Sequence, residues 1–151
     1  MGEPPRIAPF SISLRGEEQA VRGGLARIMD ALDPLSLTPD DAGTVELALA
    51  EALNNVVEHA LATSTGETII EVQGQYRDSG LHLTIIDQGQ EMPQGVAPTA
   101  REPDLDVPYA DMPEGGFGWF MIHSLASRVR YARIGDRNHL SLLLPVRLSS
   151  N

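Results

Sequence analysis

Apolar residues change their spacing partway along the chain, and this change limits the folds that the chain can adopt. Helical spacing marks residues 17–32 and 39–61, and again 119–127. Alternation of apolar and polar residues predicts five strands, over residues 10–14, 68–73, 81–86, 129–133 and 139–144. The last four strands form two hairpins, with turns predicted at 77–80 and 135–138. Because strands and helices do not alternate regularly, we expect an α+β fold: a two-layer sandwich with helices on one face of a mixed, mostly antiparallel sheet.

The second helical segment carries a clear start signal, because Thr38 is a good N-cap and Pro39 suits the first helical position. At 151 residues, the chain has about the size of one domain. It shows no internal repeat and no second domain. We therefore expect one folded domain over residues 10–147, with flexible tails at 1–9 and 148–151.

The charge of the chain excludes several kinds of function. Acidic residues outnumber basic ones 21 to 11, so the formal net charge is -10, and every basic residue is an arginine. Without lysine there is no Schiff base and no phosphate-binding P-loop lysine, and the net charge disfavours direct binding to nucleic acid or an anionic membrane. The absence of cysteine excludes thiolate chemistry.

The start, MGEPPRIAPF, is not typical of a signal peptide, and no apolar run approaches the length of a membrane helix. We therefore expect a cytoplasmic protein.

One side of the second helical segment is polar. Glu51 and Asn55 are four residues apart and therefore neighbours on the helix surface, and Glu58 and His59 follow on the same side, away from the apolar stripe. A carboxylate beside an amide oxygen suits Mg²⁺, which prefers hard oxygen ligands. The carboxylate could instead act as a general base. A solvated polar face is the alternative, and the spacing alone does not exclude it.

Two further motifs have functional and ordinary interpretations. Asp87 and Gly89 follow a predicted buried strand, where the carboxylate could accept a hydrogen bond from a ligand amine or simply belong to a turn. Gly116 and Gly118 open the third predicted helix, where backbone N–H groups could approach a phosphate or merely form a flexible link. Between these motifs, residues 88–116 hold five prolines and lack periodicity, which is typical of a functional lid or a disordered segment.

The order of these motifs resembles the GHKL-type (Bergerat-fold) superfamily, which includes the gyrase and histidine-kinase ATPases. The matching stretches are ELALAEALNNVVEHA, IIDQG and EGGFGWFMIHSLAS. Within that superfamily, the chain is most similar to the serine/threonine kinases that act as anti-sigma factors in bacterial partner-switching systems. The similarity rests on NNVVEHA, the glycine box GGFGWFMI and the closing hairpin, and it covers roughly residues 10–147. It implies a histidine-kinase-like ATPase fold, an ATP-binding kinase domain, and ATP and Mg²⁺ as cofactors.

The resemblance also implies roles for the helix residues and the first motif after them. Glu51 matches the acidic residue proposed to activate the attacking hydroxyl, and Asn55 matches the magnesium ligand. Asp87 matches the aspartate that binds the adenine amino group, and Gly89 matches the glycine that makes room for the ring. His59 follows Asn55 by one turn and could face the phosphates or make a structural hydrogen bond.

The glycine box and the segment before it complete the implied site. Gly116 and Gly118 match the glycines beside the phosphates, at the end of a lid over about residues 90–115. Glu91 departs from the family pattern, because a second glycine is common at that position. It places a negative charge at the start of the lid and could weaken ATP binding. Arg101, within the lid, could help to neutralise the phosphates, although a surface role is the simpler interpretation.

The function implied by the resemblance is that of a regulatory serine/threonine kinase. It would phosphorylate a small anti-sigma factor antagonist (a STAS-like protein) and sequester a sigma factor or another client protein. The alternative is a catalytically weak, nucleotide-gated protein-binding module of the same fold. Homodimers are common in that family, but no sequence patch establishes one here.

The remaining polar residues receive structural interpretations. His82, His123 and His139 have no spacing typical of metal ligands. The basic group of Arg128, Arg130 and Arg133 is interpreted as a solvated edge of the last hairpin.

Overall fold

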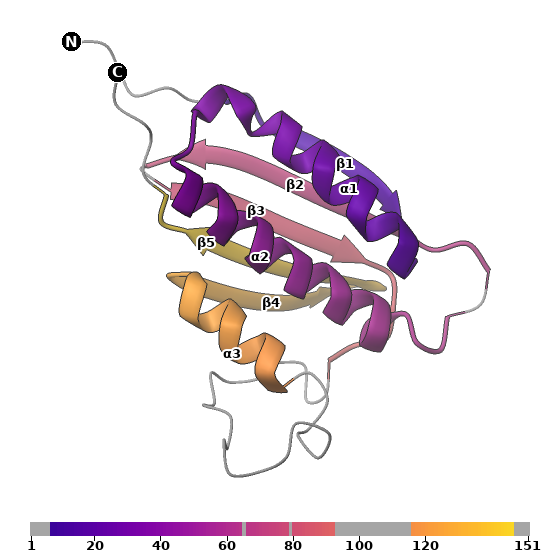
Figure 1. Cartoon of the computed structure of the whole chain (residues 1–151). Helices are drawn as coiled ribbons and strands as arrows, with labels where there is room; N and C mark the ends of the chain where they lie inside the picture. The colour runs from indigo at the N-terminus through magenta and orange to yellow at the C-terminus, as the bar shows by residue number, and fades with distance from the viewer. Residues whose placement is uncertain (1–6, 65, 79, 93–115, 147–151) are drawn as a thin grey trace.

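The computed structural model describes residues 7–64, 66–78, 80–92 and 116–146 of the chain (Figure 1). Within these ranges, the α-helices are α1 (Glu18–Ala31), α2 (Pro39–Asn55) and α3 (Gly116–Leu125). The strands are β1 (Phe10–Arg15), β2 (Ile69–Arg77), β3 (Gly80–Asp87), β4 (Arg128–Ile134) and β5 (Arg137–Leu144). A 3₁₀ turn, η1 (Asp33–Leu35), follows α1, and a π-helical turn, η2 (Val56–Ala60), follows α2. None of these helices is long and apolar enough to cross a membrane.

The strands form one sheet in the order β1-β2-β3-β5-β4. All four pairings between the described strands are antiparallel, so the parallel component of the predicted mixed sheet does not occur among them. The three α-helices lie across one face of the sheet (Figure 1). The predicted two-layer α+β sandwich is therefore confirmed. The position of β5 between β3 and β4 is an additional feature of the structure.

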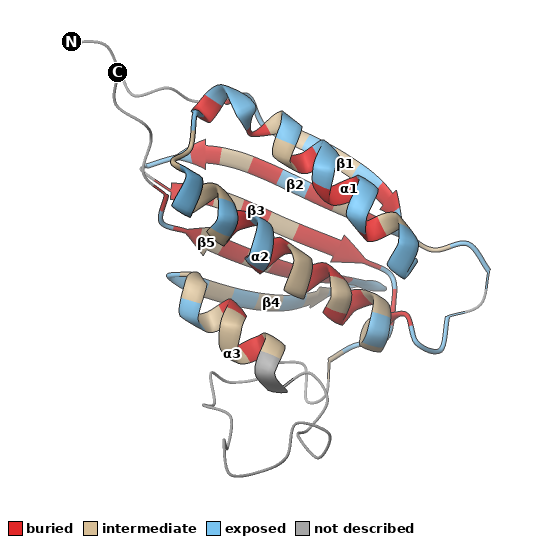
Figure 2. Cartoon of the chain, viewed as in Figure 1, coloured by how far each residue is buried: buried red, intermediate tan, exposed pale blue. Residues whose placement is uncertain are grey.

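The helix α2 packs against the middle of the sheet through a regular apolar stripe. Its N-terminus is capped as predicted, since the Thr38 hydroxyl oxygen accepts a hydrogen bond from the Asp41 N–H (3.2 Å). Its buried residues recur every three or four positions: Val45, Ala48, Leu49, Ala52, Leu53 and Asn55. The apolar members of this set join the inward-facing side chains of the strands in one hydrophobic cluster, which also contains Ile7 from the segment predicted as a tail. In Figure 2, the buried residues, in red, lie along the central strands and at intervals along the helices.

The helix predicted to continue to about residue 61 changes character after Asn55. The last turn is π-helical, as in the hydrogen bond from the Leu61 N–H to the Val56 carbonyl (2.9 Å), which spans five residues. The change accompanies a contact with the chain after β3, where the Gln90 N–H donates to the Ala60 carbonyl (2.8 Å). The periodicity of the sequence does not predict the change to a π turn, because the residue that makes the accompanying contact, Gln90, lies 30 positions further along the chain.

The last hairpin turns more tightly than the sequence suggests. Only Gly135 and Asp136 separate β4 from β5, and Gly135 has a left-handed backbone conformation (φ +61°) that glycine adopts without strain. The predicted turn over 135–138 is therefore wrong at its second half: Arg137 and Asn138 belong to β5. As a result, Asn138 pairs with Asp87 across the sheet.

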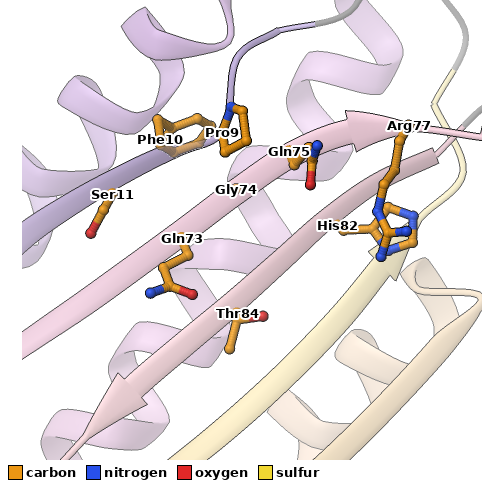
Figure 3. A pocket seen from close by; sticks show the side chains of 9 residues that line it. All are labelled: Pro9, Phe10, Ser11, Gln73, Gly74, Gln75, Arg77, His82 and Thr84. Atoms are coloured by element: carbon orange, nitrogen blue, oxygen red, sulfur yellow. The ribbon is translucent and has the colours of Figure 1, made fainter.

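Within the described ranges, no helix covers the opposite face of the sheet, and the side chains on that face are mostly polar. A shallow pocket of about 440 Å³ lies there, lined by residues of β1, β2 and β3: Pro9, Phe10, Ser11, Gln73, Gly74, Gln75, Arg77, His82 and Thr84 (Figure 3). Burial and the neighbouring Arg77 lower the pKa of His82. None of the predicted site residues lines this pocket, so the candidate site has to be sought on the helix side.

Candidate functional site

Asp87 ends β3 with its carboxylate buried beneath the helical layer. Only 4% of the residue is exposed. One carboxylate oxygen, Oδ1, accepts hydrogen bonds from the Gly89 backbone N–H (2.8 Å) and from Nδ2 of Asn138 (2.9 Å). Burial raises the pKa of Asp87, and these two hydrogen bonds and nearby Arg133 partly oppose the rise. Within the described part of the chain, Oδ2 has no hydrogen-bond partner, so it can accept one from a ligand.

A polar cluster on the last hairpin holds this carboxylate in place. Asn138 lies next to Asp87 in the sheet and is also 4% exposed. Its Oδ1 accepts from the Tyr131 hydroxyl and from Nη1 of Arg133 (3.0 Å). Its Nδ2 reaches, besides Asp87, the Gln90 carbonyl (2.9 Å) and, more distantly, the Gly89 carbonyl (3.4 Å). The hairpin therefore fixes both the carboxylate and the chain that follows it.

Local sequence pattern did not predict this cluster. Arg133 was grouped with Arg128 and Arg130 as a solvated edge, and for Arg133 this interpretation is wrong, because its Nη1 also donates to the Gly89 carbonyl (2.7 Å). Strand alternation was the available signal: Tyr131 and Arg133 share one face of β4, while Arg128 and Arg130 lie on the other. Asn138 gave no signal, because it was placed in a turn.

Gly89 packs directly against the end of the π turn. A side-chain carbon at this position would lie 2.2 Å from the carbonyl oxygen of Ala60, closer than such atoms can approach. The glycine is therefore needed for packing, whether or not a ligand ring lies beside it. Because the Gln90 N–H also binds the Ala60 carbonyl, the chain after Asp87 is joined to the end of α2 and η2.

Glu51 and Asn55 meet the first turn of α3. A side-chain carbon on Gly118 would lie 2.9 Å from Oε2 of Glu51 and 3.7 Å from both Oδ1 and Nδ2 of Asn55. The α3 helix begins at Gly116, so the backbone N–H groups of its first turn, which have no acceptor within the helix, and the positive end of its dipole lie at this contact. The structure thus brings Glu51 and Asn55 to Gly118 of the glycine box.

Two buried polar atoms near the end of α2 have no partner among the residues that the structure describes. Nδ2 of Asn55 and Nε2 of His59 are buried without a hydrogen bond in the described part of the chain. Most buried polar groups are paired, so such atoms point to a missing ligand or water. Asn55 is 8% exposed, which contradicts the alternative of a solvated polar face for this residue, whereas Glu58, in the π turn η2 that follows, is exposed.

The residues fit a magnesium ion that is shared with a ligand. Among the described residues, no three histidine or carboxylate side chains gather as a metal site. Asn55 offers an amide oxygen beside the Glu51 carboxylate, and Mg²⁺ is commonly bound through one or two protein ligands together with phosphate oxygens and water. The amide and the carboxylate would therefore suffice only if phosphate groups completed the coordination.

The remaining predicted site features are placed as follows. Glu91 is exposed and Met92 is held by its backbone N–H, which donates to the Tyr131 hydroxyl (3.0 Å). Most of the segment predicted as a lid, and Arg101 within it, lie outside the described residues.

Comparisons with known proteins agree with the fold. A family model described as the histidine kinase-like ATPase domain matches residues 14–144. The serine-protein kinase RsbW of Halalkalibacterium halodurans is 34% identical over 96 residues, which cover 63% of this chain and 57% of that protein. The RsbW of Bacillus mycoides is 30% identical over 92 residues, covering 60% and 56%. The alignments thus span little more than half the length of these curated relatives.

Solved structures show the same fold at lower sequence identity. One contains the RsbU and RsbW domains of a Mycobacterium tuberculosis protein; it matches 95% of this chain and 35% of that chain, with a TM-score of 0.64 and 20% identity. The histidine kinase domain of a blue-light activated kinase from Erythrobacter litoralis matches 83% of this chain and 61% of that chain, with a TM-score of 0.52 and 17% identity. With the family model covering most of the sequence, the chain belongs to the family of histidine kinase-like ATPase domains.

Proposed function

We propose that the protein binds Mg-ATP and transfers the terminal phosphoryl group to a serine or threonine of a small antagonist protein. The family of ATPase domains supports nucleotide binding, and the relatives named serine-protein kinase RsbW support phosphoryl transfer to protein. Following the resemblance to the anti-sigma factor kinases, the proposal includes a second activity in the cytoplasm. The unphosphorylated antagonist competes with a sigma factor or similar client for the kinase, and phosphorylation of the antagonist frees the kinase to hold that client.

The observation that carries the proposal is the buried Nδ2 of Asn55, which lies beside the first turn of α3 and has no partner among the described residues. Nε2 of His59, one turn further along the chain, is likewise buried without a partner in this part of the structure. Both can donate a hydrogen bond, and the helix start offers further N–H groups. Donors without acceptors at the positive end of a helix suit phosphate oxygens. The Oδ2 atom of Asp87, which has no partner among the described residues, supplies the acceptor that an adenine amine requires.

Each residue would then have a distinct chemical task. Asp87 accepts a hydrogen bond from the adenine amine. Asn55 gives its amide oxygen to Mg²⁺, and the ion supplies neutralisation of the phosphate charge when bound. Glu51 takes the proton from the attacking hydroxyl as a general base. Phosphoryl transfer depends mainly on positioning and charge stabilisation, so a site with few catalytic side chains is adequate.

Transfer of labelled phosphate from ATP to candidate antagonist proteins tests the proposal. Glu51→Gln keeps the shape of the side chain, so ATP affinity should stay within a few-fold, while transfer falls by about 10²–10⁴, the usual effect of losing a general base. Glu46→Gln is the matched control, because Glu46 lies exposed on the same helix and should transfer at the wild-type rate.

Two results would contradict this assignment. Wild-type transfer rates in Glu51→Gln would remove Glu51 as the base. A wild-type protein that binds its client in an ATP-dependent way, yet transfers phosphate to no cognate antagonist, would favour the alternative of a nucleotide-gated binding module.

A further inference from the structure

The amide group of Asn138 has no hydrogen-bonding capacity left for a ligand. Its two N–H groups match two acceptors at 2.9 Å, Oδ1 of Asp87 and the Gln90 carbonyl. Its oxygen has two lone pairs and accepts from the Tyr131 hydroxyl and from Nη1 of Arg133. A fully paired, buried amide of this kind positions other groups and does not contact the ligand itself.

Arg133 determines which way this amide points. A guanidinium group has donors only, so the atom of Asn138 facing Nη1 has to be the oxygen. A flipped amide would place two sets of N–H donors against each other. The NH₂ group is therefore directed at Asp87, and the orientation follows from the chemistry of its neighbours.

This orientation of the Asn138 amide makes the two carboxylate oxygens of Asp87 unequal. Oδ1 receives two donors, from Gly89 and Asn138, and these fill its two lone-pair positions. Within the described residues, Oδ2 receives none. The buried carboxylate thus presents a single accepting oxygen to a ligand.

We propose that Asn138 is a positioning residue that selects adenine over guanine by leaving Asp87 with one free acceptor oxygen. The inference rests on the proposed binding of ATP at this site and deepens it. Adenine presents one amine donor, which a single oxygen can satisfy. Guanine presents an oxygen acceptor where adenine has its amine, and its N1–H and N2–H₂ donors lie side by side. A carboxylate with two free oxygens can bind these two donors together, and the engagement of Oδ1 by Asn138 prevents this.

Direct titration of wild-type protein and Asn138→Leu with Mg-ATP and with Mg-GTP tests the inference. Leucine has nearly the same size as asparagine but no donor, so it frees one lone pair of Oδ1. We expect the ratio of ATP to GTP affinity to fall by about tenfold or more, which is the effect of the one additional hydrogen bond to a charged group that guanine can then make. Asn138→Ser also lacks a donor that can reach Asp87, and it carries the test if the leucine variant does not fold.

Leu142→Ala is the matched control for stability. Leu142 lies on the same strand and face as Asn138, is 2% exposed and pairs with Leu83, away from Asp87. Its truncation should lower the melting temperature through the cavity that it leaves. The ratio of ATP to GTP affinity should stay at the wild-type value, because no contact to Asp87 changes.

The pH dependence of ATP binding gives a readout that a structural role would not move. Asn138 helps to lower the pKa of Asp87 against the effect of burial, and Arg133 and His139 act in the same direction. Removing Asn138 should therefore raise the pKa of Asp87, so ATP affinity should begin to fall at a higher pH than in the wild type.

The possible outcomes separate this inference from the proposed function. A wild-type protein that binds no ATP contradicts the proposed function. A wild type that prefers ATP, with folded Asn138 variants that keep this preference, leaves that function intact and overturns the selective role of Asn138, whatever the pH profile of the variants. Equal wild-type affinity for ATP and GTP would also overturn it.

Discussion

At the scale of single residues, Asp87 shows that the burial of a carboxylate in a binding site lowers the stability of the fold when that carboxylate is ionised. Its carboxylate is buried, and burial raises its pKa more than its two hydrogen bonds lower it. A group whose pKa is higher in the folded than in the unfolded chain binds a proton more tightly when folded. The ionised form that a ligand amine requires is therefore the form that the fold disfavours.

Replacement of Asp87 by asparagine separates binding from folding. In Asp87→Asn, the new amide keeps an oxygen that can accept from Gly89 and Asn138, but it presents an NH₂ group in place of Oδ2. The NH₂ group of the new side chain then faces the adenine amine, which is also a donor, and ATP affinity should fall by about 10- to 100-fold. Because the buried charge is gone, the free energy of unfolding at pH 7 should fall by no more than about 1 kcal/mol. Calorimetric titration and urea unfolding measure the two effects, and equal ATP affinity in both proteins would remove the assignment.

The pH dependence of the wild type has a definite sign. Below the raised pKa, Asp87 is protonated and can no longer accept freely from an amine, so ATP affinity should decrease as the pH falls through that value. Stability without ligand should show the reverse contribution: Asp87 lowers the free energy of unfolding as the pH rises from its usual value near 3.8 through the raised pKa. Titrations from pH 4.5 to about 7.5 test the first effect. In Asp87→Asn this component of the pH dependence should vanish, and its persistence would assign it to another group.

At the scale of helices and strands, local pattern predicted every described α-helix and strand but not their ends. Apolar spacing placed α1, α2 and the two hairpins, because each buries one side against the other layer. The π turn after Asn55 and the start of β5 at Arg137 were missed. Both coincide with contacts to the chain after Asp87, and neither local propensity nor periodicity records contacts between distant segments.

Gly89 and the π turn test that long-range contact. Gly89→Ala would force a side-chain carbon against the backbone of Ala60, which cannot move aside as a flexible side chain can. We expect a loss of about 1–3 kcal/mol in the free energy of unfolding, typical of overpacking. Gly43→Ala is the control, since Gly43 lies in α2 with no atom within 4 Å of the added carbon. It should gain up to about 1 kcal/mol from helix propensity. Chemical denaturation compares them, and equal effects would contradict the packing role of Gly89.

At the scale of the whole molecule, the candidate site forms where the C-terminal part of α2 meets the start of α3 and where the end of η2 meets the chain that follows β3. The order of the motifs in the sequence predicted Glu51, Asn55, Asp87 and the glycine box as one site, and the structure brings α2 to α3 and the end of β3 to the end of η2. The network of Tyr131, Arg133 and Asn138 depends on how β5 pairs with β3, which no single segment encodes. The resemblance to known kinases supplied the roles, while the supporting residues emerged only from the assembled sheet.

Stabilisation of the whole fold by Mg-ATP provides the last prediction. A ligand that binds only the folded state stabilises it by about 2.7 kcal/mol at 100 times its dissociation constant, which for a domain of this size raises the melting temperature by about 5–11 °C. If Asn55 holds the metal, Asn55→Ala should lose most of the additional shift that Mg²⁺ gives over ATP with a chelator. Asn54→Ala is the matched control, because Asn54 is the adjacent, half-buried residue of the same helix and should keep the shift. Thermal melts with ATP alone and with Mg-ATP measure it. A magnesium-dependent shift that survives in Asn55→Ala, or disappears equally in Asn54→Ala, would show that the metal is held elsewhere.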